Sequence, residues 1–315
     1  MKIGLVDVDS RIPNLALMKL SAYHKSLGDE VKMLDPLFDK PDLIYASKVF
    51  GSSEHYRYFP QGCEVIMGGS GYDLKLKLPD GIEHTCPDYS LYDQGFSMGF
   101  SSRGCIRSCG FCIVPQKEGR FHPVADIYEF WDKQSHIKLL DNNLTSESEH
   151  FERIVKQLVK NKVKTDFNQG LDIRLIDDAK AKLLSKVKLW KNGRLRFAWD
   201  SMDLEQDVLR GIEILTKYML PYRLMFYVLI GYDTTVDEDL YRVEMLKSLG
   251  VDPFAMPYDK NNPYQADFAR WVERKEIFNS VSWPDYRKTR GGDRYQTRQT
   301  SYSGAEGQNE VSAST

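Results

Sequence analysis

Three cysteines stand close together in the first half of the chain. Cys105, Cys109 and Cys112 lie within eight residues, with three residues in the first gap and two in the second. Thiolates this close on a short loop are expected to converge on one centre, because the chain between them is too short to reach separate sites. A four-iron cluster normally takes four Cys ligands, so three leave one iron without a protein ligand. An open metal position indicates chemistry at the metal rather than a structural role.

A structural zinc ion is the alternative, held by the three cysteines and a fourth ligand such as His122. Tight zinc sites usually show paired arms of two Cys each, and this segment does not have them. A cluster that only transfers electrons is a second alternative. Such a carrier needs a fourth protein ligand, and no fourth Cys lies near the motif. The spacing therefore favours an iron-sulfur cluster with an open iron.

Size and composition are those of a globular protein. The chain has 315 residues, of which 42% are hydrophobic and 28% charged, enough for two domains or one large domain with an appendage. The 43 Lys and Arg nearly balance the 45 Asp and Glu, so nucleic acid is neither indicated nor excluded by charge. No run reaches the roughly 18 apolar residues of a membrane span, so we expect no membrane partner.

Two features predict a cytoplasmic location. Residues 1–14 carry no basic region followed by an apolar core, so we expect no secretory signal. Five cysteines, three of them clustered, argue against a disulfide scaffold and for a reducing compartment. An oxygen-sensitive cluster would need the same conditions.

Residues 1–95 predict a small domain with a parallel sheet. Apolar runs that read as strands occur at 2–8, 30–35, 42–50 and 63–69. A helical pattern over 14–27 ends at Gly28. Strands separated by crossovers indicate a Rossmann-like arrangement. The glycines of IMGGSGYD follow the fourth strand without opening a helix, so we interpret them as a tight turn rather than a phosphate site.

Residues 96–260 repeat a unit of one strand and one helix. Strands are predicted at 97–101, 136–140, 163–167, 194–199, 223–230 and 251–256, and helices at 146–162, 203–219 and 236–249. Ser146 with Glu149 and Thr235 with Glu238 fit capping boxes. Six units are fewer than the eight of a complete barrel of roughly 250 residues. The predicted fold class is therefore α/β, with a small Rossmann-like sheet followed by a partial (βα)6 barrel of the TIM type.

The chain after the barrel changes twice. Residues 261–287 carry apolar side chains at helical spacing and predict a C-terminal helical extension. Residues 288–315 are rich in Gly, Ser, Thr, Gln and Arg without an apolar pattern, and we expect a disordered tail there.

The cysteine motif, with Phe111 directly before its last Cys, resembles the radical S-adenosylmethionine (radical SAM) enzymes. The run GCIRSCGFCIVPQKEG is most similar to their methylthiotransferase-like branch, where a Val-Pro pair also follows the third Cys. The resemblance implies that Cys105, Cys109 and Cys112 hold a [4Fe-4S] cluster. It also implies that S-adenosylmethionine (SAM) chelates the fourth iron and that Phe111 lies against its adenine.

The resemblance also implies a reaction. An electron from a flavodoxin or ferredoxin passes through the cluster to SAM, which is cleaved to methionine and a 5′-deoxyadenosyl radical that removes a hydrogen atom from a substrate. Methylthiotransferases carry a second cluster on three N-terminal Cys and an RNA-binding β-domain at the C-terminus. Here only Cys63 and Cys86 lie outside the motif, and residues 261–315 are not expected to form that β-domain. The substrate is therefore left open, with tRNA or another nucleoside among several classes.

Residues 1–95 resemble, by their place before the cysteine loop, the cobalamin-binding domain of many radical SAM proteins. That domain ligates cobalt through a His in a DxHxxG segment after its first strand. This chain has DVDSRIPN there, with Asp7 and Asp9 but no His. We therefore expect a degenerate domain that shapes the substrate entrance and does not bind cobalamin.

The resemblance places the contacts to SAM at the C-terminal ends of the barrel strands, where parallel barrels carry their chemistry. The residues at these positions are Asn142, Asn143, Gln169, Arg174, Asp200, Gly231 and Met256. Asp200 is expected to bind ribose hydroxyls, and the two Asn the amino group. Gly231 and Met256 are expected beside the adenine. Each polar residue could instead be a turn former or helix cap, and Arg174 a surface ion pair.

Overall fold

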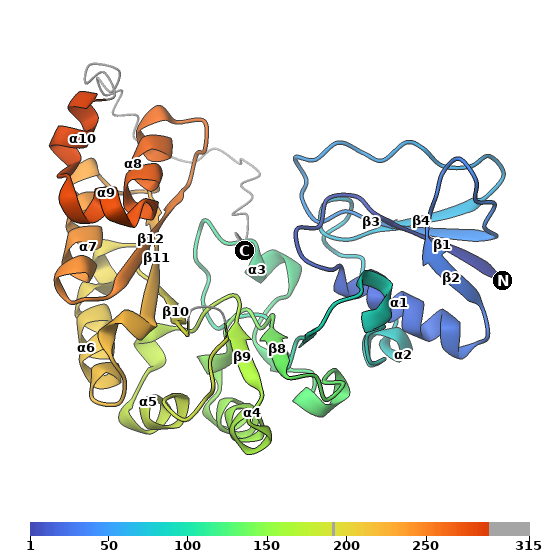
Figure 1. Ribbon diagram of the computed structural model, residues 1–315, viewed down its shortest axis with the longest axis horizontal. Coiled ribbons are helices and arrows are strands. Elements are labelled where there is room, and N and C mark those ends of the chain that lie inside the picture. Colours follow the sequence, from blue (N-terminus) through green and yellow to red (C-terminus); the bar gives the residue numbers. More distant parts are fainter. Residues whose placement is uncertain (191–192, 290–315) are drawn as a thin grey trace. The chain divides into compact units, whose positions relative to one another are not determined.

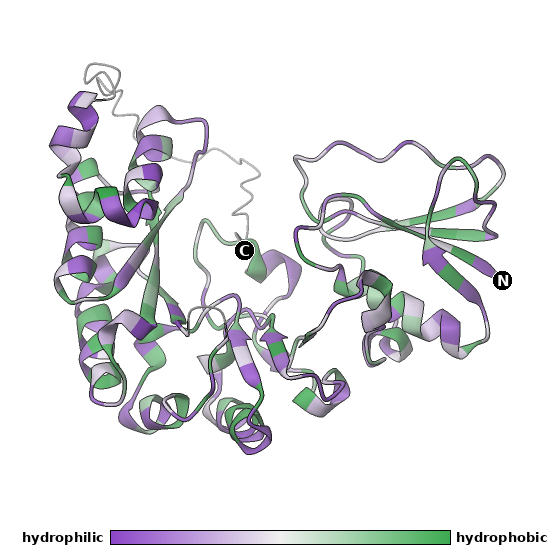
Figure 2. Ribbon diagram, in the orientation of Figure 1, coloured by the Kyte–Doolittle hydropathy of each residue, from purple (hydrophilic) through white to green (hydrophobic). Residues whose placement is uncertain are grey.

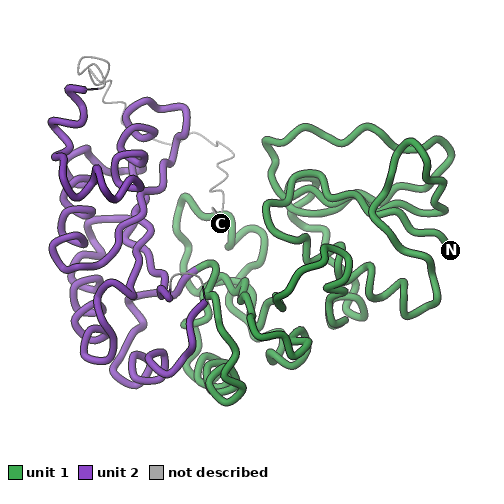
Figure 3. The backbone as a smooth tube through the Cα atoms, in the orientation of Figure 1, with its two compact units in different colours: residues 1–169, 310–315 green, residues 170–309 purple. Residues whose placement is uncertain are grey.

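The computed structural model of the protein describes residues 1–190 and 193–289. It is a mixed α/β structure with parallel sheets (Figure 1). The chain divides into two compact units, the first running to Gln169 and the second beginning at Gly170 (Figure 3). This division falls inside the segment 96–260 that the sequence predicts as one barrel.

The first unit opens with a parallel sheet in the order β2-β1-β3-β4. The strands are β1 (Lys2–Asp7), β2 (Glu30–Met33), β3 (Leu43–Ser47) and β4 (Glu64–Gly68), as predicted. Helix α1 (Leu15–Ser26) joins β1 to β2, and Asn14 caps it by accepting a hydrogen bond from Leu17 N. The described segments 34–42 and 48–63, which form the next two connections, contain no helix. Loops therefore replace two of the crossover helices of a full Rossmann unit.

Both faces of this sheet are nonetheless covered. On one face, Leu17 and Leu20 of α1 pack with Ile3 and Leu5 of β1. On the other face, Val6, Ile44 and Ala46 are covered by apolar side chains from the two long loops and β4 instead of by a helix. The covering residues are Leu34, Tyr56, Phe59, Cys63 and Val65. A parallel sheet requires such cover on both faces.

Glycine makes the turn after β4, as the sequence predicts. Gly69 has a φ of +90°, and a Cβ atom on it would lie 2.4 Å from Lys48 O. Only a residue without a side chain fits this approach. A short helix α2 (Asp80–Glu83) and a 3-10 turn η1 (Tyr89–Tyr92) then lead to the second sheet.

The second sheet of the first unit is parallel, in the order β5-β8-β9. Its strands are β5 (Ser97–Gly99), β8 (His136–Leu139) and β9 (Lys164–Phe167). Helix α4 (Ser148–Asn161) follows β8 and buries Phe151, Ile154, Val155 and Leu158. The predicted capping box of Ser146 with Glu149 is wrong: Ser146 ends a 3-10 turn η3 (Leu144–Ser146), and Glu147 takes the N-cap position without a side-chain bond.

Between β5 and β8 the chain forms a hairpin that the sequence did not predict. It consists of β6 (Ser102–Arg103) and β7 (His122–Pro123), with the short helix α3 (Val114–Lys117) between them. A 3-10 turn η2 (Ile127–Glu129) follows. The predicted strand 97–101 therefore ends at Gly99, where the chain turns toward the cysteines.

The second unit is built on a parallel sheet in the order β10-β11-β12. Its strands are β10 (Leu195–Ala198), β11 (Leu224–Ile230) and β12 (Asp252–Pro257). The helices are α5 (Asp178–Leu184), α6 (Glu205–Thr216) and α7 (Val236–Ser248), with 3-10 turns η4 (Ile173–Leu175), η5 (Met202–Leu204) and η6 (Pro221–Arg223). Figure 2 shows hydrophobic residues along β11 and a mixture of both kinds on the helices, as expected for a buried central strand. The predicted capping box of Thr235 with Glu238 at the start of α7 is confirmed.

Three helices close the described chain, namely α8 (Pro263–Glu273), α9 (Lys275–Ser280) and α10 (Trp283–Thr289). Phe268, Trp271, Phe278 and Trp283 form an aromatic cluster among them. Lys288 and Thr289, predicted as the start of the disordered tail, belong to α10. The rest of that prediction lies outside the described residues. Within residues 1–190 and 193–289, no helix is long and apolar enough to cross a membrane.

Candidate functional site

The three cysteines lie on a loop whose two ends are joined by the β6–β7 hairpin. Arg103 of β6 pairs with His122 of β7. Just inside this pair, Cys105 N donates a hydrogen bond to Gly119 O across 3.3 Å. Gly104 has a φ of +75°, and a Cβ atom there would lie 2.3 Å from Arg120 O. The neck of the loop is therefore too narrow for any side chain at Gly104.

Ion pairs hold the same neck. The Arg103 guanidinium contacts the carboxylates of Glu83 at 2.6 Å and Glu118 at 3.2 Å, and it lies 4.1 Å from the centre of the Phe100 ring. Lys19 of α1 also pairs with Glu83, at 3.2 Å. Burial opposes the ionisation of Glu83, but the charges and hydrogen bonds of Arg103 and Lys19 outweigh it and lower the pKa of that carboxyl group. The network ties the neck of the cysteine loop to helices α1 and α2.

Asp141, two residues after the end of β8, holds the start of the loop in place. The buried carboxylate of Asp141 accepts hydrogen bonds from the backbone N–H and the hydroxyl of both Ser101 and Ser102, at 2.6 to 3.2 Å. Burial raises the pKa of Asp141, and these four donors act against that rise. Ser101 Oγ also lies 3.1 Å from Nε2 of His150, whose pKa falls to about 4 because of burial and the nearby Arg153 charge. His150 is therefore neutral at pH 7.

The two asparagines that follow Asp141 contact the loop itself. Asn142 Oδ1 accepts a hydrogen bond from Gly104 N at 3.0 Å. Asn143 Nδ2 donates to Sγ of Cys105 at 3.3 Å, and Arg107 N donates to the same sulfur at 3.3 Å. Hydrogen bonds of this kind to a ligand sulfur tune iron-sulfur clusters. Whether Asn142 and Asn143 also contact SAM stays a prediction.

The thiols themselves are half-buried and separate. Cys105, Cys109 and Cys112 are reduced, and Cys112 N donates to Cys109 O in a turn of 3.0 Å. In residues 1–190 and 193–289, no three Cys, His, Asp or Glu side chains are grouped so that they could hold a metal ion. Three thiols on one loop, with N–H donors aimed at Cys105 Sγ, nevertheless form a donor set that suits a cluster. The convergence of the three sulfurs on one centre remains a prediction.

Two further predicted contacts lie in the first unit. Phe111 is half-buried within the cysteine loop. Gln169 is exposed, two residues beyond the end of β9, and is the last residue of this unit. Their grouping with Asn142 and Asn143 stays a prediction.

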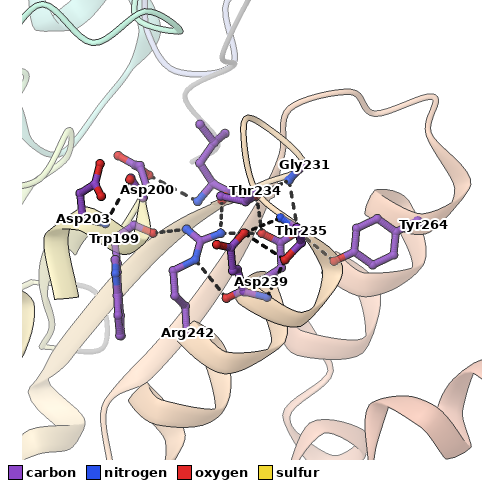
Figure 4. Close-up of polar contacts among 12 residues, drawn as sticks. Trp199, Asp200, Asp203, Gly231, Thr234, Thr235, Asp239, Arg242 and Tyr264 are labelled. Carbon is purple, nitrogen blue, oxygen red and sulfur yellow. Dashed lines mark hydrogen bonds and ion pairs between the residues drawn. The ribbon is translucent and has the colours of Figure 1, made fainter. Parts of the chain in front are cut away.

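In the second unit, the structure brings three predicted residues to one edge of the sheet. Asp200 follows β10, and its carboxylate accepts a hydrogen bond from Leu229 N at 3.3 Å (Figure 4). Leu229 of β11 pairs directly with Met256 of β12. Gly231 follows the end of β11. Asp200, Gly231 and Met256 therefore share the C-terminal edge of the β10-β11-β12 sheet.

The carboxyl group of Asp200 is unusually basic. Burial raises its pKa from 3.8 to about 6, against the lowering effects of the Leu229 N–H and of the Arg242 and Arg174 charges. The charge of Asp172 adds to the rise. Arg174 forms a two-pronged ion pair with Asp172, at 2.6 and 3.1 Å. Arg174, also predicted to contact SAM, thus belongs to the charged surroundings of Asp200.

Gly231 is glycine for a steric reason. Its φ is +76°, and a Cβ atom there would lie 2.0 Å from Nε2 of Gln265. Gln265 is itself buried and held, because its Oε1 accepts a hydrogen bond from Asp259 N at 2.7 Å. The side chain of Gln265, in α8, therefore packs against Gly231 and fixes its backbone.

The sequence analysis missed the buried pair of Asp239 and Arg242, which lies directly behind this edge (Figure 4). The signal was present as an Asp and an Arg three positions apart at the start of α7. That spacing is more often a surface ion pair, and burial at both positions could not be read from the sequence.

Comparison with known proteins adds no assignment. No protein-family model matches the chain, and no curated protein is significantly similar to it in sequence.

Proposed function

We propose that this chain is a radical SAM enzyme, in which Cys105, Cys109 and Cys112 hold a [4Fe-4S] cluster and SAM binds the open iron. The bound cluster and SAM would supply a 5′-deoxyadenosyl radical that takes a hydrogen atom from an organic substrate, after reduction by a flavodoxin or ferredoxin. The observation that carries the proposal is the cysteine loop. It follows a parallel strand and closes on itself at Gly104, and Cys105 Sγ accepts one hydrogen bond from Arg107 N in the loop and one from Asn143 Nδ2 after β8.

The surroundings of the loop support a cluster site because hydrogen bonds hold the first residues of the loop in fixed positions. Asp141 accepts four hydrogen bonds from Ser101 and Ser102, and Asn142 accepts one from Gly104 N. Preorganised ligands lower the cost of assembling a metal site. The N–H donors at Cys105 would stabilise negative charge on the ligand sulfur and on the reduced cluster.

The strand edge of the second unit supports a place for SAM. A carboxylate accepts two hydrogen bonds side by side, so Asp200 can bind the two hydroxyls of a ribose. Gly231 presents backbone without a side chain, and the backbone of Met256 can meet an adenine edge. The amide oxygen of Asn142 has two lone pairs, so its bond from Gly104 N does not prevent a bond to the amino group of SAM. The six strands β5 and β8 to β12 would then belong to one partial (βα)6 barrel.

Metal analysis and electron paramagnetic resonance (EPR) test the proposal. Protein reconstituted anaerobically with iron and sulfide should contain about four irons per chain, and its reduced EPR signal should change when SAM is added. Cys105→Ala, Cys109→Ala and Cys112→Ala should lose the cluster. Cys63→Ala and Cys86→Ala are matched controls that should keep it. Zinc in place of iron, or a cluster whose EPR signal does not change when SAM is added, would overturn the proposal.

A further inference from the structure

Arg242 of α7 joins the ends of two strands from inside the second unit. Its guanidinium donates hydrogen bonds to Trp199 O at 2.6 Å and to Leu229 O at 2.9 Å (Figure 4). Trp199 is the residue before Asp200, and Leu229 is the residue whose N–H binds the Asp200 carboxylate. Arg242 therefore holds the backbone directly before Asp200 and the residue whose N–H binds the Asp200 carboxylate.

Asp239 completes this arrangement one turn earlier on α7. Its carboxylate accepts hydrogen bonds from Arg242 Nη2 at 2.5 Å, Thr234 Oγ1 at 2.7 Å and Gly231 N at 3.2 Å. Arg242 and Asp239 are both fully buried. One buried ion pair thus fixes the backbone on either side of the strand edge, at Trp199 and at Gly231.

Helix α8 supports the pair from the other side. The Tyr264 hydroxyl donates to Asp239 at 2.8 Å, and burial and the Asp239 charge raise the pKa of Tyr264 so that the hydroxyl keeps its proton. The next residue, Gln265, lies against Gly231 and accepts a hydrogen bond from Asp259 N after β12. Tyr264 and Gln265 of α8 therefore support this network at Asp239 and beside Gly231.

We propose that Arg242 is a positioning residue for SAM, acting with Asp239 and Tyr264 to hold Asp200 and Gly231 in the geometry that binds the nucleoside part of that ligand. The inference rests on the proposed function. Its physical basis is that binding groups must be held to within a fraction of an ångström, and a buried guanidinium with several fixed acceptors does so at little cost in flexibility. The arrangement also explains why a buried ion pair stands where apolar residues would pack.

The charge of Arg242 gives a readout that a purely structural role would not move. Asp200 is faced by Arg242 from α7, by Arg174 and Asp172 from the η4 turn, and by Leu229 N from β11. Arg242 favours the ionised form of Asp200, which is the form that accepts ribose hydroxyls. Removing the ion pair as a unit, in Arg242→Met with Asp239→Asn, should move the loss of SAM binding on acidification to a higher pH.

Equilibrium dialysis with SAM on the anaerobically reconstituted full chain tests the inference, with cluster content and thermal midpoint measured beside it. At pH 8, Arg242→Lys and Tyr264→Phe should each raise the dissociation constant about tenfold or more, because a buried hydrogen bond is lost, while the iron content stays at the wild-type value. Tyr264→Phe removes a single hydrogen bond and keeps the test available if Arg242→Lys fails to fold.

Lys247→Met is the matched control on the same helix. Its ammonium group donates to Phe278 O and lies over the Phe278 ring, away from the strand edge. It should lower the thermal midpoint without changing the affinity for SAM. Wild-type affinity in the Arg242 and Tyr264 variants, an unmoved pH midpoint in the double variant, or equal weakening in Lys247→Met would overturn the inference alone. A wild-type protein that holds its cluster but does not bind SAM would overturn the proposed function and the inference with it.

Discussion

The side-chain amide of Asn143 donates a hydrogen bond to Sγ of Cys105 across 3.3 Å. The two residues come from different strand ends, and Arg107 N reaches the same sulfur from within the loop. A cysteine sulfur with two N–H donors is suited to hold negative charge. This contact links the cysteine motif to the neighbouring strand and leads to the first prediction.

Replacing Asn143 by Leu should lower the reduction potential of the cluster. The N–H donor stabilises the additional negative charge of the reduced state, so its loss favours the oxidised state. Redox titration followed by EPR, without SAM, measures the potential. Asn161→Leu is the control, since Asn161 donates to Tyr128 and Gln157 on the surface of α4. Equal potentials for the two variants would mean that the Asn143 contact does not tune the cluster.

Comparing Gly104→Ala with Gly119→Ala separates the cost of a positive φ from the cost of a steric clash at the Cβ atom. Both glycines have a positive φ, +75° and +74°, which costs an L-residue about 1–2 kcal/mol. A Cβ atom on Gly104 also meets Arg120 O at 2.3 Å, whereas one on Gly119 meets nothing within 4 Å. We expect Gly104→Ala to destabilise the protein by about 1–3 kcal/mol more than Gly119→Ala, the usual cost of overpacking, and to lose iron.

Urea unfolding and iron analysis of these two variants check that expectation. If both lose the same free energy of unfolding and keep the same iron content, the closure of the loop neck at Gly104 is not required for the cluster.

Asp200→Asn should stabilise the protein at neutral pH. The pKa of Asp200 is about 6 in the folded state and 3.8 as an ordinary carboxyl group, so folding favours its protonated form. Its contribution to stability is greatest below pH 4 and is lost as the pH rises from about 4 to about 6. An Asn avoids that loss, and since a rise in pKa from 3.8 to about 6 corresponds to about 3 kcal/mol, the variant should gain up to roughly this much at pH 7.5.

Denaturant unfolding of the apo-protein at pH 7.5 and pH 4 measures the effect. The gain should be present at pH 7.5 and absent at pH 4, and SAM binding should be lost. A destabilised variant at pH 7.5 would show that the Asp200 carboxylate is needed for the fold rather than for a ligand. A gain in stability with a loss of binding is the usual sign of a functional residue.

The strands of the three parallel sheets and the long amphipathic helices could be predicted from the sequence because each is an apolar run or a helical stripe. The hairpin of β6 and β7 could not, since each strand has two residues and no pattern to read. The asparagines after β8 were placed correctly at a strand end. Their contacts with Gly104 and Cys105 depend on that hairpin and could not be predicted. The sequence alone predicted only that the two asparagines contact SAM, by resemblance to a known family.

Burial decided the other differences. Asp239 and Arg242 have the spacing of an exposed ion pair on a helix, yet both are fully buried against the strand ends. Ser146 and Glu149 have the spacing of a capping box, but a 3-10 turn over Leu144–Ser146 uses the serine before the helix begins. In each case the spacing of the two residues fits both the predicted and the observed arrangement. Only the packing against distant segments distinguishes the two.

The central claim is that this chain cleaves SAM reductively at a cluster on its three clustered cysteines. The most direct measurement is anaerobic incubation of the reconstituted protein with SAM and dithionite, followed by an assay for 5′-deoxyadenosine. We expect 5′-deoxyadenosine from the wild type and none from Cys105→Ala, Cys109→Ala or Cys112→Ala. A protein that holds a stable [4Fe-4S] cluster and forms no 5′-deoxyadenosine would contradict the claim.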